Sequence, residues 1–260
     1  MHPWGPPRIR LAALAVWRRN LLVWRKLLGP ALAMNFGEPV LYLLGLGYGL
    51  GFFIGEMAGM PYLSFLASGI VASSAMTTAS FEGMYSVFTR MVPQRTYEAI
   101  LATPLDADDI VTGELLWCAT KSLISATAIL VVAVAMGALP ATPGLVLVLP
   151  VVFLTGLAFA GPALVVSAVA PNYDFFNYYM VLVITPMFIL SGVFYPIDTL
   201  PTTLQDAVQF LPLTHAVALS RSLVAGTGTA VAWVHVVVLS AYAMVGHYFA
   251  AVLIRRRLLR

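Results

Sequence analysis

Long apolar segments are the feature that most restricts how this chain can fold. Of its 260 residues, 60% are hydrophobic and only 10% are charged, whereas a soluble domain carries about 25% charged residues. Six segments are each long enough to cross roughly 30 Å of hydrocarbon as a helix. They are residues 31–54, 62–88, 110–137, 144–170, 175–195 and 229–254. Because lipid offers backbone groups no hydrogen-bond partner, these segments predict an all-α polytopic membrane protein with six transmembrane helices.

Basic residues predict the orientation of these helices. If the spans alternate in direction, twelve of the fourteen Lys and Arg residues fall on one side of the membrane. They are Arg8, Arg10, Arg18, Arg19, Arg25, Lys26, Arg90, Arg95, Arg255, Arg256, Arg257 and Arg260. The exceptions are Lys121, inside the third span, and Arg221, before the sixth. Since basic residues favour the cytoplasmic side, we expect both termini there.

Residues 8–28 differ from the spans because their apolar positions form a stripe. Large apolar residues recur at helical spacing, at Leu14, Trp17, Leu21, Trp24 and Leu28. This pattern predicts an N-terminal amphipathic interfacial helix on the cytoplasmic leaflet. The alternative is that this segment is only a basic flank that sets topology.

Residues 196–228 are too long for a turn and contain three prolines. Apolar residues still repeat at helical spacing from Leu200 to Leu211. We expect a short helix that dips into the outer leaflet or lies on it, an outer re-entrant or interfacial segment before the last span.

Four alternating glycines, Gly45, Gly47, Gly49 and Gly51, mark the first span. Small residues of this kind allow helices to approach closely, so they predict close helix packing.

The sequence lacks the common motifs of catalytic and cofactor sites. The sequence has no GxxxxGK[ST] phosphate loop, a single cysteine, Cys118, and four histidines without metal-ligand spacing. One acidic cluster, Asp106, Asp108 and Asp109, follows Pro104 at the start of the third span. It is expected to cap that helix, and the alternative is a site for a divalent ion with a sugar nucleotide.

Four charged residues fall inside apolar segments, where charges are costly and are therefore functional candidates. They are Glu38, Glu82, Glu114 and Lys121. Glu82 and Lys121 are predicted to pair between neighbouring helices, and a charge-swapped double variant would test this. These residues either stabilise the bundle or contact a substrate.

The loop at residues 90–109, which precedes the third span, is predicted to contain a further short helix. Pro93 and Pro104 bracket a short helical segment, 94–103. So short a helix is marginal alone in water, so the bundle or a partner must hold it. Such a helix is suited to transmit movement.

Three motifs resemble a known family. They are T-Y-E-A-I-L-A-T-P-L-D-x-D-D-I-V-x-G-E at 96–114, S-G-V-F-Y-P-I-D-T-L-P at 191–201 and P-L-T-H-A-V-A-L-S-R at 212–221. Together with the order of segments, they resemble the permease subunits of ABC type-2 exporters, in particular the nodulation J-type lipooligosaccharide exporters. The likeness covers essentially the whole chain, so residues 1–260 are expected to be a single ABC type-2 transmembrane domain.

The resemblance implies partners and roles. Such permeases are homodimers in the bacterial inner membrane, surrounded by membrane lipids and joined to two copies of a cytoplasmic ABC ATPase. The resemblance implies that ATP and magnesium bind that ATPase, with no cofactor on this chain and no nucleic acid as a partner. The helix at 94–103 would be the coupling helix, residues 8–28 a gate-side collar, and residues 196–228 an outer re-entrant hairpin. The coupling residues would be Gln94, Arg95, Thr96, Tyr97, Glu98, Ala99, Ile100 and Leu101.

Aromatic residues gather along the fifth span. Those singled out for a substrate path are Phe175, Tyr178, Tyr179, Phe188 and Phe194. They form either an interfacial aromatic belt or a surface on which sugar rings stack during export.

The sequence therefore favours an exporter permease rather than an enzyme. Its expected cargo is a lipooligosaccharide or related glycolipid, and drugs or other lipid-linked molecules are alternatives. An intramembrane glycolipid-modifying enzyme would depend on the Asp106–Asp109 cluster. A secondary transporter would tend to have duplicated halves and a midplane ion site, and the sequence shows neither.

Overall fold

The computed structural model describes residues 4–26, 37, 39–227 and 231–259. This part of the chain is almost entirely helical, apart from one antiparallel hairpin of two short strands, β1 (Glu56–Met57) and β2 (Met60–Pro61). Gly55 and Gly59 shape the hairpin with φ values of 70° and 76°, which glycine adopts without a steric penalty. The predicted class of an all-α membrane protein is confirmed, with this small hairpin as an addition.

Four helices are long and apolar enough to cross a membrane. They are Tyr62–Met91, α7 (Ala107–Ala135), α8 (Gly144–Val169) and α13 (Ala232–Leu258). The first of these is continuous but has three parts, namely α4 (Tyr62–Phe81), the π-helical η2 (Glu82–Ser86) and α5 (Val87–Met91). Each of the four coincides with a predicted segment to within a few residues at either end.

Two further apolar helices are shorter, Pro39–Ile54 and Phe175–Leu190. The first contains the π-helical η1 (Leu43–Leu50) and α3 (Gly51–Ile54), and the second contains α9 (Phe175–Tyr179), the π-helical η3 (Met180–Ile184) and α10 (Thr185–Leu190). The predicted segment 31–54 begins outside the described residues. Within the predicted segment 175–195, the helix ends at Leu190, because the chain turns at Gly192 with a φ of 78°. The count of six spans therefore stays a prediction.

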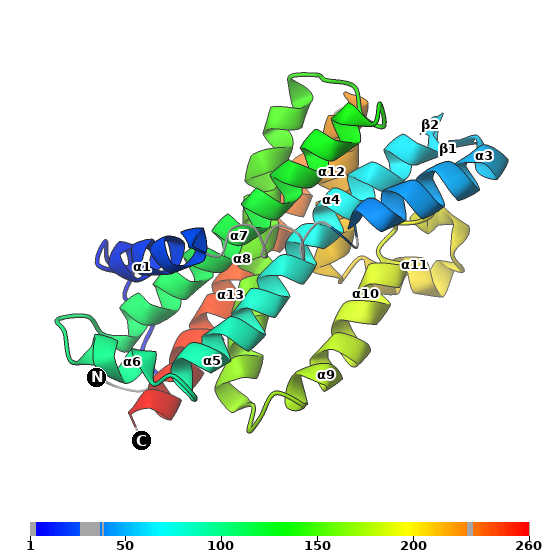
Figure 1. Cartoon of the computed structure of the whole chain (residues 1–260). Helices are drawn as coiled ribbons and strands as arrows, with labels where there is room; N and C mark the ends of the chain where they lie inside the picture. The colour runs from blue at the N-terminus through cyan, green and yellow to red at the C-terminus, as the bar shows by residue number, and fades with distance from the viewer. Residues whose placement is uncertain (1–3, 27–36, 38, 228–230, 260) are drawn as a thin grey trace.

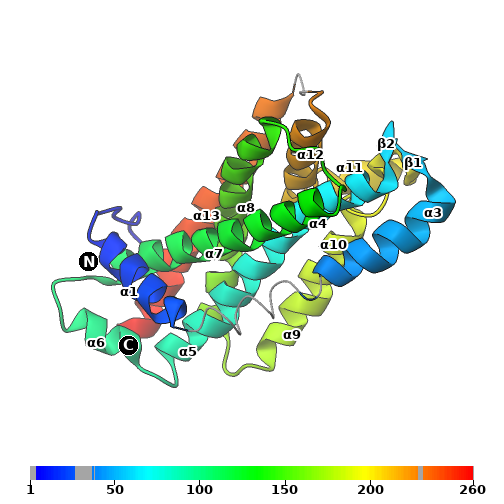
Figure 2. The same ribbon diagram turned by 45° about the horizontal axis from the view of Figure 1, so that its top comes forward.

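Helix α8 lies at the centre of the bundle and packs against α7, α13, α4 and α12 (Pro212–Ala225). Figures 1 and 2 show these helices crossing at inclined angles. Helices α8 and α13 approach each other closely, since a Cβ added at Gly161 would lie 2.5 Å from the Cα of Gly246. Only residues without a side chain allow two backbones to come this near.

The alternating glycines predicted to allow close packing do so only in part. A Cβ added at Gly45 or Gly49 would meet no atom within 4 Å, whereas one at Gly47 would collide with the Leu63 side chain. The reason is helix rotation: of the three glycines in η1, Gly47 alone faces a side chain of another described helix.

Residues 196–228 contain two main helices instead of the one expected. They are α11 (Thr202–Val208) and α12, preceded by the short 3-10 turn η4 (Ile197–Thr199). The chain breaks between the helices because Pro212 starts α12, and Gly226 ends it with a φ of 67°. Most side chains of α12 are buried, so this helix belongs to the bundle, and its depth in a membrane stays a prediction.

The two described chain ends lie together at one end of the bundle, beside α1 (Ala13–Arg25) and α6 (Thr96–Leu101). The strand hairpin and α11 lie at the opposite end (Figure 1). Helix Phe175–Leu190 stands beside η2 and α5, where Phe176 packs against Met84 and Phe88.

Candidate functional site

A buried charged cluster surrounds Glu82, near the end of the bundle that holds the termini. Lys121 Nζ lies 2.8 Å from Glu82 Oε2, which confirms the predicted pair. Ser86 donates to the same oxygen at 2.9 Å. The other oxygen, Oε1, accepts from the Trp117 indole at 2.9 Å and from Arg90 at 3.0 Å. Each carboxylate oxygen of Glu82 therefore accepts two hydrogen bonds.

Arg90 joins Glu82 to a second buried carboxylate, because its Nη2 also lies 2.7 Å from Glu114 Oε2. From the sequence, Arg90 is only a basic residue that follows the second span, since its position along the chain does not show which helices it faces. With Lys121, the cluster holds two anions and two cations, which matters because an unpaired buried charge costs several kcal/mol. Glu38, the remaining charged candidate of the apolar segments, lies outside the described residues.

Tyr97 connects the short helix α6 to this cluster. Its side chain is completely buried, and its hydroxyl donates to Glu114 Oε1 at 2.9 Å. Burial and then the Glu114 carboxylate raise the pKa of Tyr97 well above its ordinary value, so the hydroxyl stays protonated and remains a donor. Helix α6 is therefore held by the bundle, as its short length requires.

The helix expected over 94–103 is shorter, Thr96–Leu101. It cannot extend back to Gln94, because Arg95 adopts a left-handed conformation with a φ of 49°. Gln94, Arg95, Glu98 and Ala99 are exposed and so available to a partner. Thr96, Ile100 and Leu101 are partly buried, which leaves Tyr97 as the coupling candidate that faces only the bundle. The coupling role of these residues stays a prediction.

Helix α1 packs along α7 through Ala13, Val16 and Asn20, which are its buried residues. The predicted apolar stripe does not coincide with this buried face. Its two tryptophans, Trp17 and Trp24, lie beside the buried face and contact α7. The Trp17 indole donates to Thr120 Oγ1 at 2.9 Å, because an indole N–H needs a partner when it leaves water. Asn20 donates to Glu114 at 2.9 Å, so α1 also reaches the charged cluster. Its position on a membrane surface stays a prediction.

A cavity of about 590 Å³ lies between α4, η2 and helix Phe175–Leu190. Glu82 and Lys121 line it, so the charged cluster has one face in the cavity and another at α6. Serine and threonine side chains line the α4 wall, and aromatic rings line other parts of the cavity. An amphiphilic lining of this kind suits a ligand with both polar and apolar parts.

The structure separates the five aromatic candidates for a substrate path. Only Phe188 lines the cavity, and Phe194 packs against it with ring centroids 4.9 Å apart. Phe175 and Tyr178 pair with each other elsewhere, with Tyr178 exposed, and Tyr179 is partly buried. These five rings do not form one continuous surface, and their role in transport stays a prediction.

Three cavity rings were not singled out from the sequence, namely Tyr42, Phe81 and Tyr85. Phe81 and Tyr85 stack with centroids 5.4 Å apart, and Tyr42 lies 5.9 Å from Phe188. They come from α4, η2 and the first apolar helix, so only the tertiary structure brings them beside Phe188.

The acidic cluster caps α7, as predicted. Asp106 Oδ1 accepts from the backbone N–H groups of Asp108 and Asp109, both at 3.1 Å, and Asp109 accepts in return from the backbone N–H of Asp106 at 3.0 Å. Arg10 forms ion pairs with Asp106, at 2.7 Å, and with Asp109. Over the described residues, no group of three His, Cys, Asp or Glu side chains is placed to hold a metal ion.

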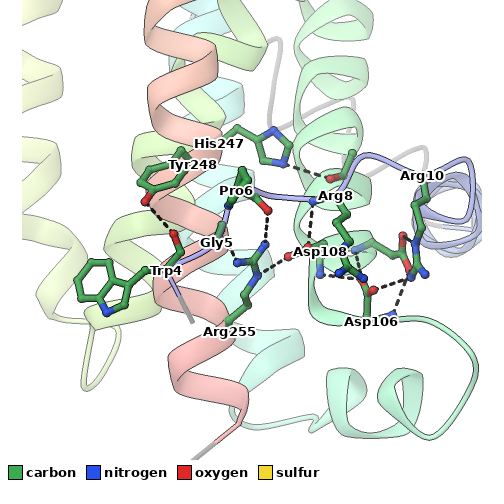
Figure 3. A network of polar contacts seen from close by, with 12 residues as sticks. Trp4, Gly5, Pro6, Arg8, Arg10, Asp106, Asp108, His247, Tyr248 and Arg255 are labelled. Atoms are coloured by element: carbon green, nitrogen blue, oxygen red, sulfur yellow. Dashed lines mark hydrogen bonds and ion pairs between the residues drawn. The ribbon is translucent and has the colours of Figure 1, made fainter. Parts of the chain in front are cut away.

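Asp108 holds the two ends of the chain together, as Figure 3 shows. It accepts from the Arg255 guanidinium and, at 3.0 Å, from the backbone N–H of Arg8. Arg255 also donates to the carbonyls of Gly5, at 2.7 Å, and Pro6, at 3.2 Å. We call this contact between Asp108, Arg255 and residues 5–8 the terminal clamp.

Arg221 lies on α12, although the sequence placed it in a loop. Its guanidinium sits 3.5 Å from the Phe65 ring centroid and donates to Ser68 Oγ at 3.2 Å and to the Gly192 carbonyl at 2.9 Å. Arg221 thereby fastens α12 to α4 and to the turn after α10.

Two histidines treated as separate in the sequence form a pair. His215 Nδ1 and His235 Nδ1 lie 2.7 Å apart, and His215 Nε2 lies 2.8 Å from the Gln209 carbonyl. This pair joins α12 to α13. The two histidines are twenty residues apart on different helices, so the sequence does not predict that they meet.

Comparison with known proteins gives consistent results. A family profile described as ABC-2 type transporter matches residues 11–225. Nodulation protein J of Rhizobium leguminosarum bv. viciae is 47% identical over 247 residues, which cover 95% of each chain. Nodulation protein J of Rhizobium meliloti is 44% identical over 246 residues, covering 95% of this chain and 94% of the relative. Inner membrane transport permease YadH of Escherichia coli is 26% identical over 214 residues, or 80% of each chain.

Proposed function

This chain belongs to the ABC-2 type transporter family, and on that premise we propose that it is the permease subunit of an ATP-driven exporter. Family membership makes it an integral membrane subunit of a transporter and not an enzyme. The acidic cluster on which an enzymatic alternative would depend is already used, by the cap of α7 and by Arg10.

The proposed permease has six transmembrane helices and lies in the bacterial inner membrane with both termini in the cytoplasm. Support comes from the arrangement of the chain: the described ends, α1 and α6 share one end of the bundle (Figure 1), and most basic residues belong to these segments. On this orientation, α11 and α12 form the outer re-entrant hairpin, and Arg221 fastens it to α4.

One observation carries the proposal of coupling, a continuous chain of hydrogen bonds from α6 to the cavity. Tyr97 bonds Glu114, Arg90 bridges Glu114 to Glu82, and Glu82 lines the cavity with Lys121. We call this series the polar relay. When an ATPase moves α6, the relay moves η2 and α7 with it, which changes the shape of the cavity.

The ABC-2 family implies that this permease works with an ABC ATPase. We propose a homodimer of this chain with two copies of that ATPase, which binds ATP and magnesium. The partner would contact the exposed residues of α6, including Arg95, Glu98 and Ala99.

The proposed cargo is an amphiphile, a lipooligosaccharide or a related glycolipid. Two observations support it: the relatives named Nodulation protein J match almost the whole chain, and the cavity lining is amphiphilic. Export of drugs or of other lipid-linked molecules is the second candidate, supported by the more distant likeness to a transport permease of Escherichia coli.

Co-purification tests the proposal. The full-length permease, expressed with its candidate ATPase, should retain that ATPase through purification and should move labelled glycolipid into inverted membrane vesicles only when ATP is supplied outside. Ala99→Arg, on the exposed face of α6, should abolish association. Asp174→Arg, at an exposed position of the loop before α9, is the control and should keep it. Glycolipid export by the permease in the absence of any ATPase would refute the proposal.

A further inference from the structure

Hydroxyl groups line the α4 cavity on two sides. Six serine and threonine residues contribute to its lining: Ser73, Ser74, Thr77, Thr78, Ser86 and Thr185. A hydroxyl can donate one hydrogen bond and accept two, so its role toward a ligand depends on where its hydrogen is already used.

Most of these hydroxyl hydrogens are used within their own helices. Ser73 and Ser74 each donate to the carbonyl three residues earlier, at 3.0 and 3.1 Å. Thr77 and Thr185 donate to carbonyls four and five residues earlier, both at 3.0 Å. Ser86 donates to a carboxylate oxygen of the polar relay at 2.9 Å. Five of the six hydroxyls therefore offer the cavity lone pairs alone.

The charges in the cavity do not favour an anion. The lining contains one carboxylate and one ammonium group, Glu82 and Lys121, which pair with each other at 2.8 Å. Lys121 is therefore already neutralised, and the neighbouring acceptor oxygens would repel a phosphate or carboxylate. An anionic head group entering this cavity would lose its water beside the Glu82 carboxylate and the lone pairs of five hydroxyl groups, which is costly.

Aromatic rings line another part of the cavity. Phe81 and Tyr85 stack beside the hydroxyl wall, and Phe188 lines the cavity from α10. Flat rings bury apolar faces of a ligand, while acceptors satisfy its donors, so together they suit a ring that carries hydroxyl groups at its edge.

We propose that this cavity selects cargo with an uncharged head group rich in hydrogen-bond donors, a neutral glycan, and that Ser73, Ser74 and Thr77 set this selectivity as an acceptor wall. The inference rests on the proposed function, since it assumes that the head group of the cargo enters the cavity. The acceptor wall then binds hydrogen-bond donors of the head group, and the cavity disfavours anionic head groups.

Lipid binding to the full chain in nanodiscs tests the acceptor wall without an ATPase. The probes are a fluorescent monoglucosyl diacylglycerol, the same lipid with every sugar hydroxyl methylated, and fluorescent phosphatidic acid of equal chain length. The glucosyl lipid should bind roughly tenfold more tightly than either of the others, because only its hydroxyl groups can donate hydrogen bonds to the acceptor wall without bringing in a charge. Equal binding of the glucosyl and methylated lipids, or tighter binding of phosphatidic acid, would overturn the inference.

A variant locates the selectivity. Replacing Ser73 and Ser74 by Ala and Thr77 by Val should lower the ratio of the affinities for the glucosyl and methylated lipids toward one. The affinity for the methylated lipid should stay unchanged. The matched control is Thr127→Val, which removes a hydroxyl that donates to its own helix in the same way at 2.6 Å but lies outside the cavity. An unchanged preference in the triple variant contradicts the proposed residues. Selective binding without ATPase association would refute the proposed function alone, whereas association without selectivity would refute this inference alone.

Discussion

The Tyr97 hydroxyl lies 2.9 Å from Glu114 Oε1, and this hydrogen bond joins a helix between two long apolar helices to a carboxylate within the bundle. Tyr97 is the member of α6 that is completely buried. Its ring and its hydroxyl therefore serve attachment to the bundle, while neighbouring side chains of α6 remain free to contact a partner. Attachment and partner binding can be tested separately for this reason.

Tyr97→Phe should uncouple the transporter without releasing its ATPase. The variant keeps the buried ring but removes the donor to Glu114, at a cost of about 1.5–3 kcal/mol for a hydrogen bond to a charged group. We expect the ATPase to co-purify normally, with less glycolipid exported for each ATP hydrolysed. The control is Tyr48→Phe, which removes an exposed hydroxyl that donates to the Met136 carbonyl at 3.1 Å. Unchanged export per ATP in Tyr97→Phe would show that the polar relay does not carry the movement.

Glu82→Gln should destabilise the protein by about 3–5 kcal/mol, because it leaves buried cations without their partner. Adding Lys121→Met should restore most of this loss, since the cluster would again be neutral with Arg90 and Glu114 as a pair. Thermal unfolding can be followed by a thiol-reactive dye, because the single cysteine, Cys118, is completely buried and becomes reactive only on unfolding.

The charge-swapped variant gives the complementary test. The sequence alone predicted that exchanging Glu82 and Lys121 would restore stability. The structure changes this expectation, because a lysine at position 82 would face Arg90 and the Trp117 N–H, which both donate to Glu82. The swapped protein should stay destabilised in the thiol assay. Full recovery would mean that these two contacts contribute nothing.

Asp108→Asn should open the terminal clamp. The asparagine cannot neutralise Arg255, whose side chain is buried and pairs with Asp108, so the hold on the carbonyls of Gly5 and Pro6 should weaken. Limited trypsin treatment should then cleave at Arg8 or Arg10 several-fold faster than in the unaltered protein. Asp174→Asn, at an exposed position of the same end, should have no effect. Equal cleavage rates in both variants would contradict the clamp.

Gly161→Ala should destabilise the crossing of α8 and α13. The added methyl group would lie 2.5 Å from the Gly246 backbone, so the helices must separate, at a cost of about 1–3 kcal/mol. The control is Gly49→Ala, where a Cβ meets no atom within 4 Å. The thiol assay should show a lower unfolding midpoint for the first variant and little change for the second. Equal midpoints would show that α8 and α13 can separate without cost.

Sequence was sufficient for features that repeat along one helix. Hydropathy located the four long apolar helices, and proline and aspartate located α6 and the cap of α7. These signals are local, because length, hydropathy and caps depend on residues close together in the chain.

Contacts between helices could not be predicted in the same way. The bridging role of Arg90, the His215–His235 pair and the Gly161–Gly246 crossing depend on how each helix is rotated about its axis. Helices that are apolar on all sides give little periodic signal of that rotation. The Glu82–Lys121 pair could be anticipated only because two opposite charges in lipid-length segments have few other ways to be neutralised.

The π-helical segments place extra residues in the helices that form the cavity walls. η2 and η3 face the cavity, through Glu82 and Ser86 from one side and Met180 and Ile184 from the other. A π turn holds one extra residue compared with an α turn, so when the π turn shifts along a helix, each residue that it passes rotates about the helix axis by about 100°. A shift of the π turn in either wall therefore changes which side chains face the cavity. Only a few backbone hydrogen bonds are exchanged, and the α-helix on either side stays intact.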